Sequence, residues 1–211
     1  MALVTLSASY GAGGSWGGPA IAERLGVPFV DRVIPTQVAE RLAVPLEDAH
    51  RRDEAVSGWL DRVLMSLVPL AQVYGGAPPE PMPVGDHSFR EATEQVIAER
   101  AASGRAVILG RAAALVLRDD PRALHVRLDG PPEARVAQAM RVQGIDRETA
   151  RRRMRETDSA RDAYVRQLYG TEPYDPALYH LVVDSTAIEL DACVELIALA
   201  ARARVGTAPE R

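Results

Sequence analysis

The residues best able to do chemistry in this chain form a glycine-rich turn near its amino end. Residues 9–14 read Ser-Tyr-Gly-Ala-Gly-Gly, between a short apolar run at 2–8 and an amphipathic segment that ends at Gly26. A strand, a glycine turn and a helix in this order predict a phosphate-binding loop, because N–H groups and the helix N-terminus converge on an anion there. A plain tight turn is the alternative. A regular P-loop adds a lysine, but Gly14 stands at that position and the chain has no lysine, so any side-chain cation must be arginine.

Two further candidates follow other apolar runs. Asp31 comes after the run 27–30, and Arg111 comes after the run 106–109. Ligands of an open parallel sheet bind beyond the carboxyl ends of its strands, so both side chains are expected near the glycine turn. Taken singly, Asp31 also fits a helix cap or surface ion pair, and Arg111 also fits a helix-side ion pair. Their joint placement favours a phosphate site.

An arginine-dense segment begins after Asp146, which is a predicted helix N-cap. Four of the five residues 151–155 are arginine, and no acidic residue balances them before Glu156. Such a field favours a polyanion, because guanidinium groups bind phosphoryl oxygens bidentately and stay protonated. The alternative is a solvated helix face.

Five apolar runs alternate with helical patterns and predict the sheet that positions these residues. The runs are 2–8, 27–30, 106–109, 123–128 and 180–183. Continuous apolar runs between helices indicate a buried parallel sheet with helices on both faces, a three-layer α/β/α arrangement. Residues 31–91 are too long for one crossover and are predicted to form a helical insert within a single domain, 1–211.

Composition narrows the classes of partner. The net charge of −4 gives no general attraction to nucleic acid or to an anionic membrane. No apolar run reaches the roughly 18 residues of a membrane span. The single cysteine, Cys193, excludes an internal disulfide, is expected to be buried, and fits a cytoplasmic protein. The histidines are scattered, and the two in predicted strands are expected to be buried and hydrogen-bonded rather than metal ligands: His125 and His180.

The order and spacing of six short segments resemble those of the nucleoside monophosphate kinases, above all the bacterial cytidylate kinase-like family. The segments are 7–14, 25–32, 107–113, 125–128, 157–164 and 178–184. The resemblance covers nearly the whole chain and implies a P-loop kinase-like fold with a five-stranded parallel sheet. It also implies an acceptor-binding insert at 31–91 and an arginine-rich lid at 144–172.

The resemblance implies roles for single residues. The phosphates of ATP or GTP would lie on the glycine turn and the residues after it, namely Tyr10, Gly11, Ala12, Gly13, Gly14, Ser15 and Trp16. Trp16 would stack on a ligand or pack against the insert. Asp31 would lie near the transferred phosphoryl group or its Mg²⁺, and the acceptor would meet Asp31, Arg32 and Arg111. The catalytic set would be Arg111, Arg153, Arg155 and Arg161, with Asp158 orienting one of the arginines.

The chain also departs from the family pattern. Cytidylate kinases have lysine where Gly14 stands, and the family usually has arginine at Ala8 and glycine at Ala112. We expect a kinase that transfers the γ-phosphoryl group to a CMP-like nucleoside monophosphate or another small acceptor, and a homo-oligomer is compatible with it. The alternatives are a non-catalytic nucleotide-binding or regulatory module, and a small-molecule kinase or sulfotransferase on the same scaffold.

Overall fold

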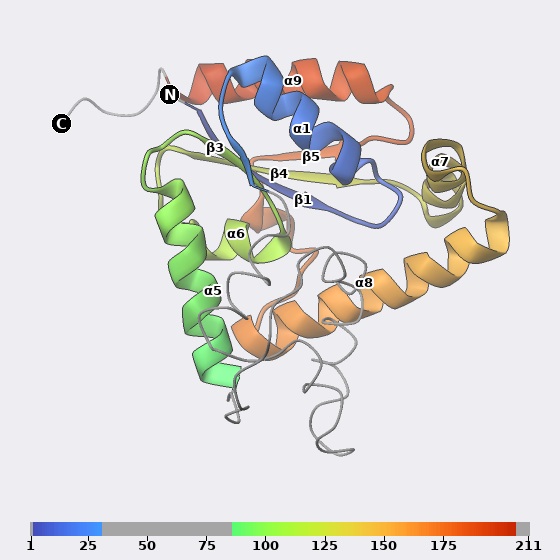
Figure 1. Cartoon of the computed structure of the whole chain (residues 1–211), viewed down its shortest axis with the longest axis horizontal. Coiled ribbons are helices and arrows are strands. Elements are labelled where there is room, and N and C mark those ends of the chain that lie inside the picture. Colours follow the sequence, from blue (N-terminus) through green and yellow to red (C-terminus); the bar gives the residue numbers. More distant parts are fainter. Residues whose placement is uncertain (1, 31–85, 206–211) are drawn as a thin grey trace, which may run out of the picture.

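One five-stranded parallel sheet forms the centre of the protein (Figure 1). The computed structural model describes residues 2–30 and 86–205. The strand order is β2-β3-β1-β4-β5. The strands are β1 (Leu3–Ala8), β2 (Phe29–Val30), β3 (Ala106–Leu109), β4 (Ala123–Asp129) and β5 (Leu181–Asp184). Leu3 of β1 is in register with Ala106 on one side and Ala123 on the other, so β1 is the central strand.

Helices cover both faces of the sheet, which confirms the predicted three-layer fold. Helices α1 (Gly14–Leu25) and α9 (Leu190–Val205) lie on one face, and α5 (Asp86–Ala101), α6 (Arg111–Val116) and α8 (Arg147–Tyr169) lie on the other (Figure 1). The side chains of β1 alternate between two cores. Val4 and Leu6 pack toward α1 and α9, whereas Leu3 packs toward α5 and α6. No helix within 2–30 and 86–205 combines the length and apolarity that crossing a bilayer requires.

The residues predicted from the sequence to end α1 and to begin α8 do so in the structure. Gly26 ends α1 with φ 63°, and its N–H donates to Ala22 O. Asp146 caps α8 by accepting the N–H of Thr149 at 2.9 Å. Several strand boundaries differ by one or two residues from expectation; for example, β2 begins at Phe29 rather than at residue 27, and β5 begins at Leu181 rather than at residue 180. The predicted insert falls largely in 31–85, outside the described residues.

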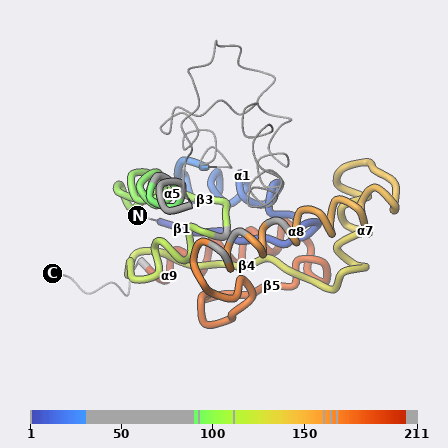
Figure 2. The backbone as a smooth tube through the Cα atoms, turned by 90° about the horizontal axis from the view of Figure 1, so that it is seen from below, coloured from blue at the N-terminus to red at the C-terminus, as the bar shows by residue number. Residues whose placement is uncertain are grey.

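Helix α8 is one continuous helix of 23 residues that contacts two separate parts of the protein. Near its N-terminus, Ala150 packs against Val136 and Ala139 of α7 (Pro132–Gln143). Near its C-terminus, Leu168 joins the core formed with α5 and α6. Figure 2 shows α8 running from α7 at one end of the molecule across the sheet. Its middle turns are thereby held over the carboxyl ends of the strands.

A histidine pair lies on the face of the sheet opposite α1. His125 is 3% exposed, and its Nδ1 is hydrogen-bonded to Thr5 Oγ1 at 2.8 Å. The His125 N–H donates to His180 Nδ1 at 2.9 Å, and the rings stack with centroids 4.9 Å apart. His125 is therefore buried and hydrogen-bonded as predicted. His180 is hydrogen-bonded, but the prediction that it is buried is wrong, because it precedes the strand and is exposed.

The stability of the fold is expected to fall as the pH drops from 6.5 toward 4. Burial, together with the nearby His180, lowers the pKa of His125 from 6.5 to about 4, so the folded state favours the neutral ring. This contribution is fully present above pH 6.5 and is lost as the pH falls through the folded-state pKa. It amounts to at most about 3 kcal/mol. Urea unfolding between pH 7 and 4.5 measures it, with His125→Gln as the non-titrating control. An equally steep pH dependence in that variant would refute the assignment.

Candidate functional site

The glycine loop (residues 9–14) joins the carboxyl end of β1 to the N-terminus of α1. Gly11 and Gly13 both have φ 79°, in the left-handed region that residues with a Cβ rarely adopt. A Cβ on Gly11 would overlap the carbonyl oxygen of Arg135, and one on Gly14 would lie 2.5 Å from the Cβ of Ala8. Close packing therefore requires glycine at both Gly11 and Gly14.

The absence of a loop lysine has a structural reason. Gly14 occupies the position at which a P-loop carries that lysine. The atom that a Cβ on Gly14 would meet belongs to Ala8, whose short side chain cannot rotate away. A lysine at position 14 would force the loop away from β1. The loop can thus present backbone N–H groups to an anion, but it has no room for a lysine stem.

The N–H groups of the loop fall into two sets. Ser9 donates to Leu128 O and Ala12 donates to Ser9 O, both at 3.1 Å, so these two are used within the fold. The N–H groups of Gly13 and Gly14 donate to no other described residue, as expected where a helix begins. With the positive end of the α1 dipole, these two groups offer the kind of hydrogen-bond donors that an anion requires.

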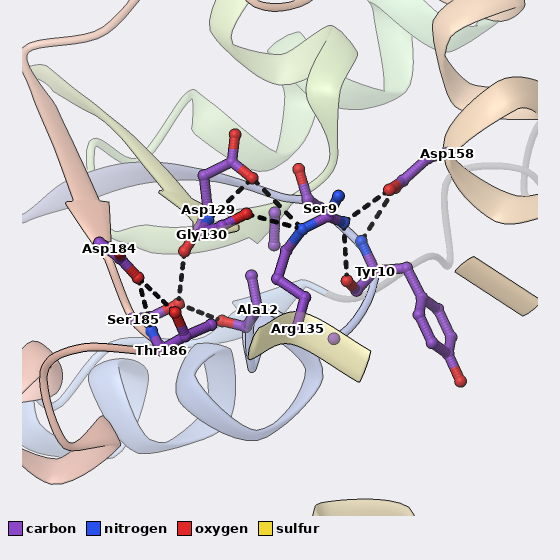
Figure 3. A network of polar contacts seen from close by, with 12 residues as sticks. Ser9, Tyr10, Ala12, Asp129, Gly130, Arg135, Asp158, Asp184, Ser185 and Thr186 are labelled. Atoms are coloured by element: carbon purple, nitrogen blue, oxygen red, sulfur yellow. Dashed lines mark hydrogen bonds and ion pairs between the residues drawn. The ribbon is translucent and has the colours of Figure 1, made fainter. Parts of the chain in front are cut away.

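A buried ion pair holds the outer side of the loop (Figure 3). Asp158 of α8 accepts the N–H of Tyr10 at 2.9 Å through Oδ1 and faces Arg135 Nη1 at 2.6 Å through Oδ2. The side chains of Arg135 and Asp158 are only 10% and 14% exposed. Arg135 of α7 also donates to Tyr10 O at 2.9 Å and to Gly130 O at 3.0 Å. Helices α7 and α8 are thus both attached to the loop through one pair of opposite charges.

A second buried cation lies beneath the loop. Arg127 of β4 is 2% exposed and donates to Ser9 Oγ at 2.9 Å and to Asp129 Oδ2. Its guanidinium carbon lies 4.3 Å from the ring centroid of Tyr174. Burial raises the pKa of Asp129, but the hydrogen bond and charge of Arg127 lower it more, so the pKa lies below its usual value. Asp129 therefore stays ionised and neutralises Arg127 beneath the loop.

The arginines of α8 separate according to their position along the helix. Arg161 is partly buried and donates from Nη1 to Ala8 O at 3.1 Å, next to the glycine loop. Arg153 and Arg155 are exposed, and Arg153 contacts Gln143 of α7 at 3.5 Å. The structure thus brings Asp158 and Arg161 to the loop but not Arg153 or Arg155.

Two arginines near the start of α8 pair with a carboxylate of another helix. Arg147 and Arg151 both pair with Glu133 of α7, at 3.1 Å and 2.9 Å. The balancing carboxylate comes from a different helix, which the local sequence does not reveal.

Other candidate residues lie beside the loop or outside the described structure. The hydroxyl of Tyr10 donates to Gln143 Oε1 at 2.9 Å. Ser15 and Trp16 are exposed on the first turn of α1, with Trp16 39% exposed. Arg111 begins α6 directly after β3, but its side chain is outside the described part of the structure, as are Asp31 and Arg32.

Two of the charged residues that hold the loop were missed by sequence reasoning. Arg135 lies in the first turns of α7, where an arginine within a helix is unremarkable in the sequence. Arg127 interrupts the otherwise apolar run Ala-Leu-His-Val-Arg-Leu, and a cation within a buried strand is a signal that could have identified it.

A model of the cytidylate kinase-like family matches residues 3–187 of this chain. The chain belongs to the cytidylate kinase-like family. This confirms the resemblance inferred from the six segments. The chain is 33% identical to the cytidylate kinase of Methanopyrus kandleri over 96 aligned residues. These residues cover 42% of this chain and 50% of that protein. The match therefore spans half the length of that relative.

Solved structures resemble this cytidylate kinase-like protein in fold. An uncharacterized protein from Eubacterium ventriosum matches with a TM-score of 0.64 at 17% identity, over 96% of this chain and 99% of that one. Shikimate kinase from Bacteroides thetaiotaomicron matches with a TM-score of 0.50 at 15% identity, over 94% of this chain and 97% of that one. A gluconokinase from Sinorhizobium meliloti matches with a TM-score of 0.50 at 20% identity, over 97% of this chain and 93% of that one. At these identities the likeness concerns the three-layer kinase fold.

Proposed function

We propose that this protein is a phosphotransferase of the nucleotide-kinase type, which moves the γ-phosphoryl group of ATP or GTP to a CMP-like nucleoside monophosphate. The observation that carries the proposal is the glycine loop, with the N–H groups of Gly13 and Gly14 open and Arg161 held beside it. Backbone donors at the start of α1, with an arginine bonded to the end of β1 beside them, suit a transferred phosphoryl group. Membership of the cytidylate kinase-like family supports the same reaction.

The loop fits a nucleoside triphosphate better than it fits a metal ion alone. A phosphate can approach the backbone closely where a Cβ would collide, as at Gly11 and Gly14. In the described ranges 2–30 and 86–205, no three His, Cys, Asp or Glu side chains gather to hold a metal. Mg²⁺ would be held mainly by the nucleotide, with Asp31 as its protein ligand, and would neutralise phosphate charge.

The residues of this chain would act by positioning and by charge. Gly13 and Gly14 would donate to donor phosphate oxygens, and Arg161 would supply the positive side chain that position 14 cannot accommodate. The acceptor phosphate would meet Arg32 and Arg111. The segment 144–172, with Arg153 and Arg155 on its exposed side, would close over the phosphates and exclude water.

A coupled assay tests the proposal directly. Nucleoside monophosphates are offered one at a time with ATP and with GTP, in the presence of Mg²⁺, and nucleoside diphosphate formation is followed. We expect turnover with at least one pyrimidine monophosphate. A folded protein that turns over none of the monophosphates with either donor would rule out this reaction.

Arg161→Ala is expected to lower kcat by about 100-fold or more, because it removes the arginine that α8 places at Ala8 O, directly before the loop. The matched control is Arg166→Ala, which removes an arginine from the same helix that pairs at the surface with Glu172. Its kcat is expected to equal that of the wild-type protein. Equal losses in both variants would show that Arg161 acts only through the general charge of α8.

A non-catalytic nucleotide-binding module is the second candidate, and the packing at Gly14 favours it because that packing excludes the usual lysine. Calorimetry separates the two candidates. Binding of ATP without turnover of any acceptor would support the module, whereas turnover that disappears in Arg161→Ala would support the kinase.

A further inference from the structure

Three consecutive carbonyl groups of the glycine loop each accept a hydrogen bond from a side chain. Tyr10 O accepts from Arg135 Nη1 at 2.9 Å, and Gly11 O accepts from Gln138 Nε2 at 3.0 Å. Ala12 O accepts from Ser185 Oγ at 2.7 Å. Figure 3 shows Arg135 and Ser185 on either side of this stretch. Every peptide unit from Tyr10 to Gly13 is therefore held by a separate donor.

The three donors are polar side chains buried inside the fold. Arg135 is 9% exposed, Gln138 is 4% exposed and Ser185 is fully buried. Arg135 and Gln138 lie three residues apart on α7 and face the same way. Ser185 directly follows β5 and is tied to the end of β4, since its N–H donates to Asp129 O at 3.1 Å. Arginine and glutamine are seldom buried this far, and here both are directed at loop carbonyls.

Holding a carbonyl also sets the direction of the next N–H group. The peptide unit is planar, with C=O and N–H pointing in opposite directions. The bonds to Tyr10, Gly11 and Ala12 therefore orient the N–H groups of Gly11, Ala12 and Gly13. Ala12 N–H returns to Ser9 O, whereas that of Gly13 is one of the two donors at the start of α1.

We propose that Arg135, Gln138 and Ser185 are positioning residues, which orient the N–H groups of the glycine loop for the phosphates of the donor nucleotide. The inference rests on the proposed function of this loop. Glycine has more backbone freedom than any other residue, so a loop with glycine at 11, 13 and 14 needs external bonds to hold one conformation. Donors that are oriented before the ligand arrives stabilise its charge most effectively.

The experiment compares anion binding by variants that each remove one donor to a loop carbonyl with anion binding by a control variant at another buried serine. Ser185→Ala removes the donor to Ala12 O, and Gln138→Met removes the donor to Gly11 O with little change of volume. The control is Ser7→Ala, because Ser7 is also fully buried on β1 and its Oγ has no hydrogen-bond partner among the described residues. The probes are inorganic tripolyphosphate and ATP with Mg²⁺, titrated well below the melting temperature of each variant.

We expect tripolyphosphate to bind Ser185→Ala and Gln138→Met about tenfold more weakly than it binds the wild-type protein, with Ser7→Ala unchanged. Ser185→Thr, which keeps the hydroxyl, restores the affinity. Amide exchange of Ala12, whose N–H is bonded to Ser9 O, is measured without ligand and is faster in the two weakened variants. These readouts follow the loop itself, whereas a purely structural role would lower only the melting temperature.

The outcomes separate the positioning role from the proposed function. Unchanged affinity in both variants, with wild-type binding intact, would overturn the positioning role and leave the kinase proposal standing. If the wild-type protein binds neither probe, the proposed function fails, and amide exchange still decides the positioning role. Unchanged exchange at Ala12 would then overturn it.

Discussion

Gly11→Ala is expected to abolish ATP binding and to lower the free energy of unfolding by about 3 kcal/mol. The new Cβ would overlap the carbonyl oxygen of Arg135, which belongs to the backbone of α7 and cannot turn aside. The same Cβ would also be strained by the left-handed conformation, with φ 79°. The loop must move, and its N–H groups lose their common direction. Urea unfolding and calorimetric titration with ATP and Mg²⁺ measure the two effects.

Gly26→Ala is the matched control for the backbone strain alone. Gly26 also has a left-handed conformation, with φ 63°, but no atom lies within 4 Å of a Cβ built there. It lies at the C-terminal end of α1, whereas the loop precedes the N-terminal end of that helix. We expect a loss of only about 1 kcal/mol and unchanged ATP affinity. Equal destabilisation by the two substitutions would refute the contact with α7 as the cause.

Asp158→Asn is expected to lower the free energy of unfolding by about 3 kcal/mol. The substitution keeps an oxygen that can accept the Tyr10 N–H but removes the charge that faces Arg135 at 2.6 Å. Arg135 would then be a buried cation without its nearest carboxylate, since Asp129 Oδ1 lies 3.7 Å from its Nε. Helices α7 and α8 would be less firmly joined. Unfolding in urea measures the change, and calorimetry reports the accompanying loss of ATP affinity.

Glu133→Gln is the control for this prediction, because Glu133 also links α7 to α8. Its pairs with Arg147 and Arg151 are exposed, and exposed pairs are screened by solvent. We expect no measurable change in stability or in ATP binding. If Glu133→Gln and Asp158→Asn behave alike, burial of the Asp158–Arg135 pair does not govern how the helices are joined.

The strands of the sheet could be predicted because each one is marked by a short continuous run of apolar residues. Residues 106–109 and the run at 2–8 read as buried strands, and their side chains are buried in the structure. The glycines that end helices, such as Gly26, mark their own positions through a left-handed conformation. Short α6 was not expected, because six residues with five small or branched aliphatic side chains carry no periodic signal.

The residues that shape the candidate site could not be predicted in the same way. Arg135 binds a carbonyl 125 positions away, and Ser185 binds one 173 positions away. No motif connects such residues, and each is unremarkable among its own neighbours. The arginines of α8 present a related difficulty. Composition shows that cations are abundant there, but only the packing of the helix decides that Arg161 reaches β1 while Arg151 meets Glu133.

The bond between Ser185 and Ala12 also bears on the order in which the protein is made. The ribosome completes the glycine loop early and adds Ser185 only after a further 173 residues. Until then the carbonyl of Ala12 lacks its donor. A nascent chain that stops before β5 would emerge with the whole nucleotide motif in its sequence and without the loop conformation that the motif requires. The hydrogen bonds that hold the loop are therefore completed only late in synthesis.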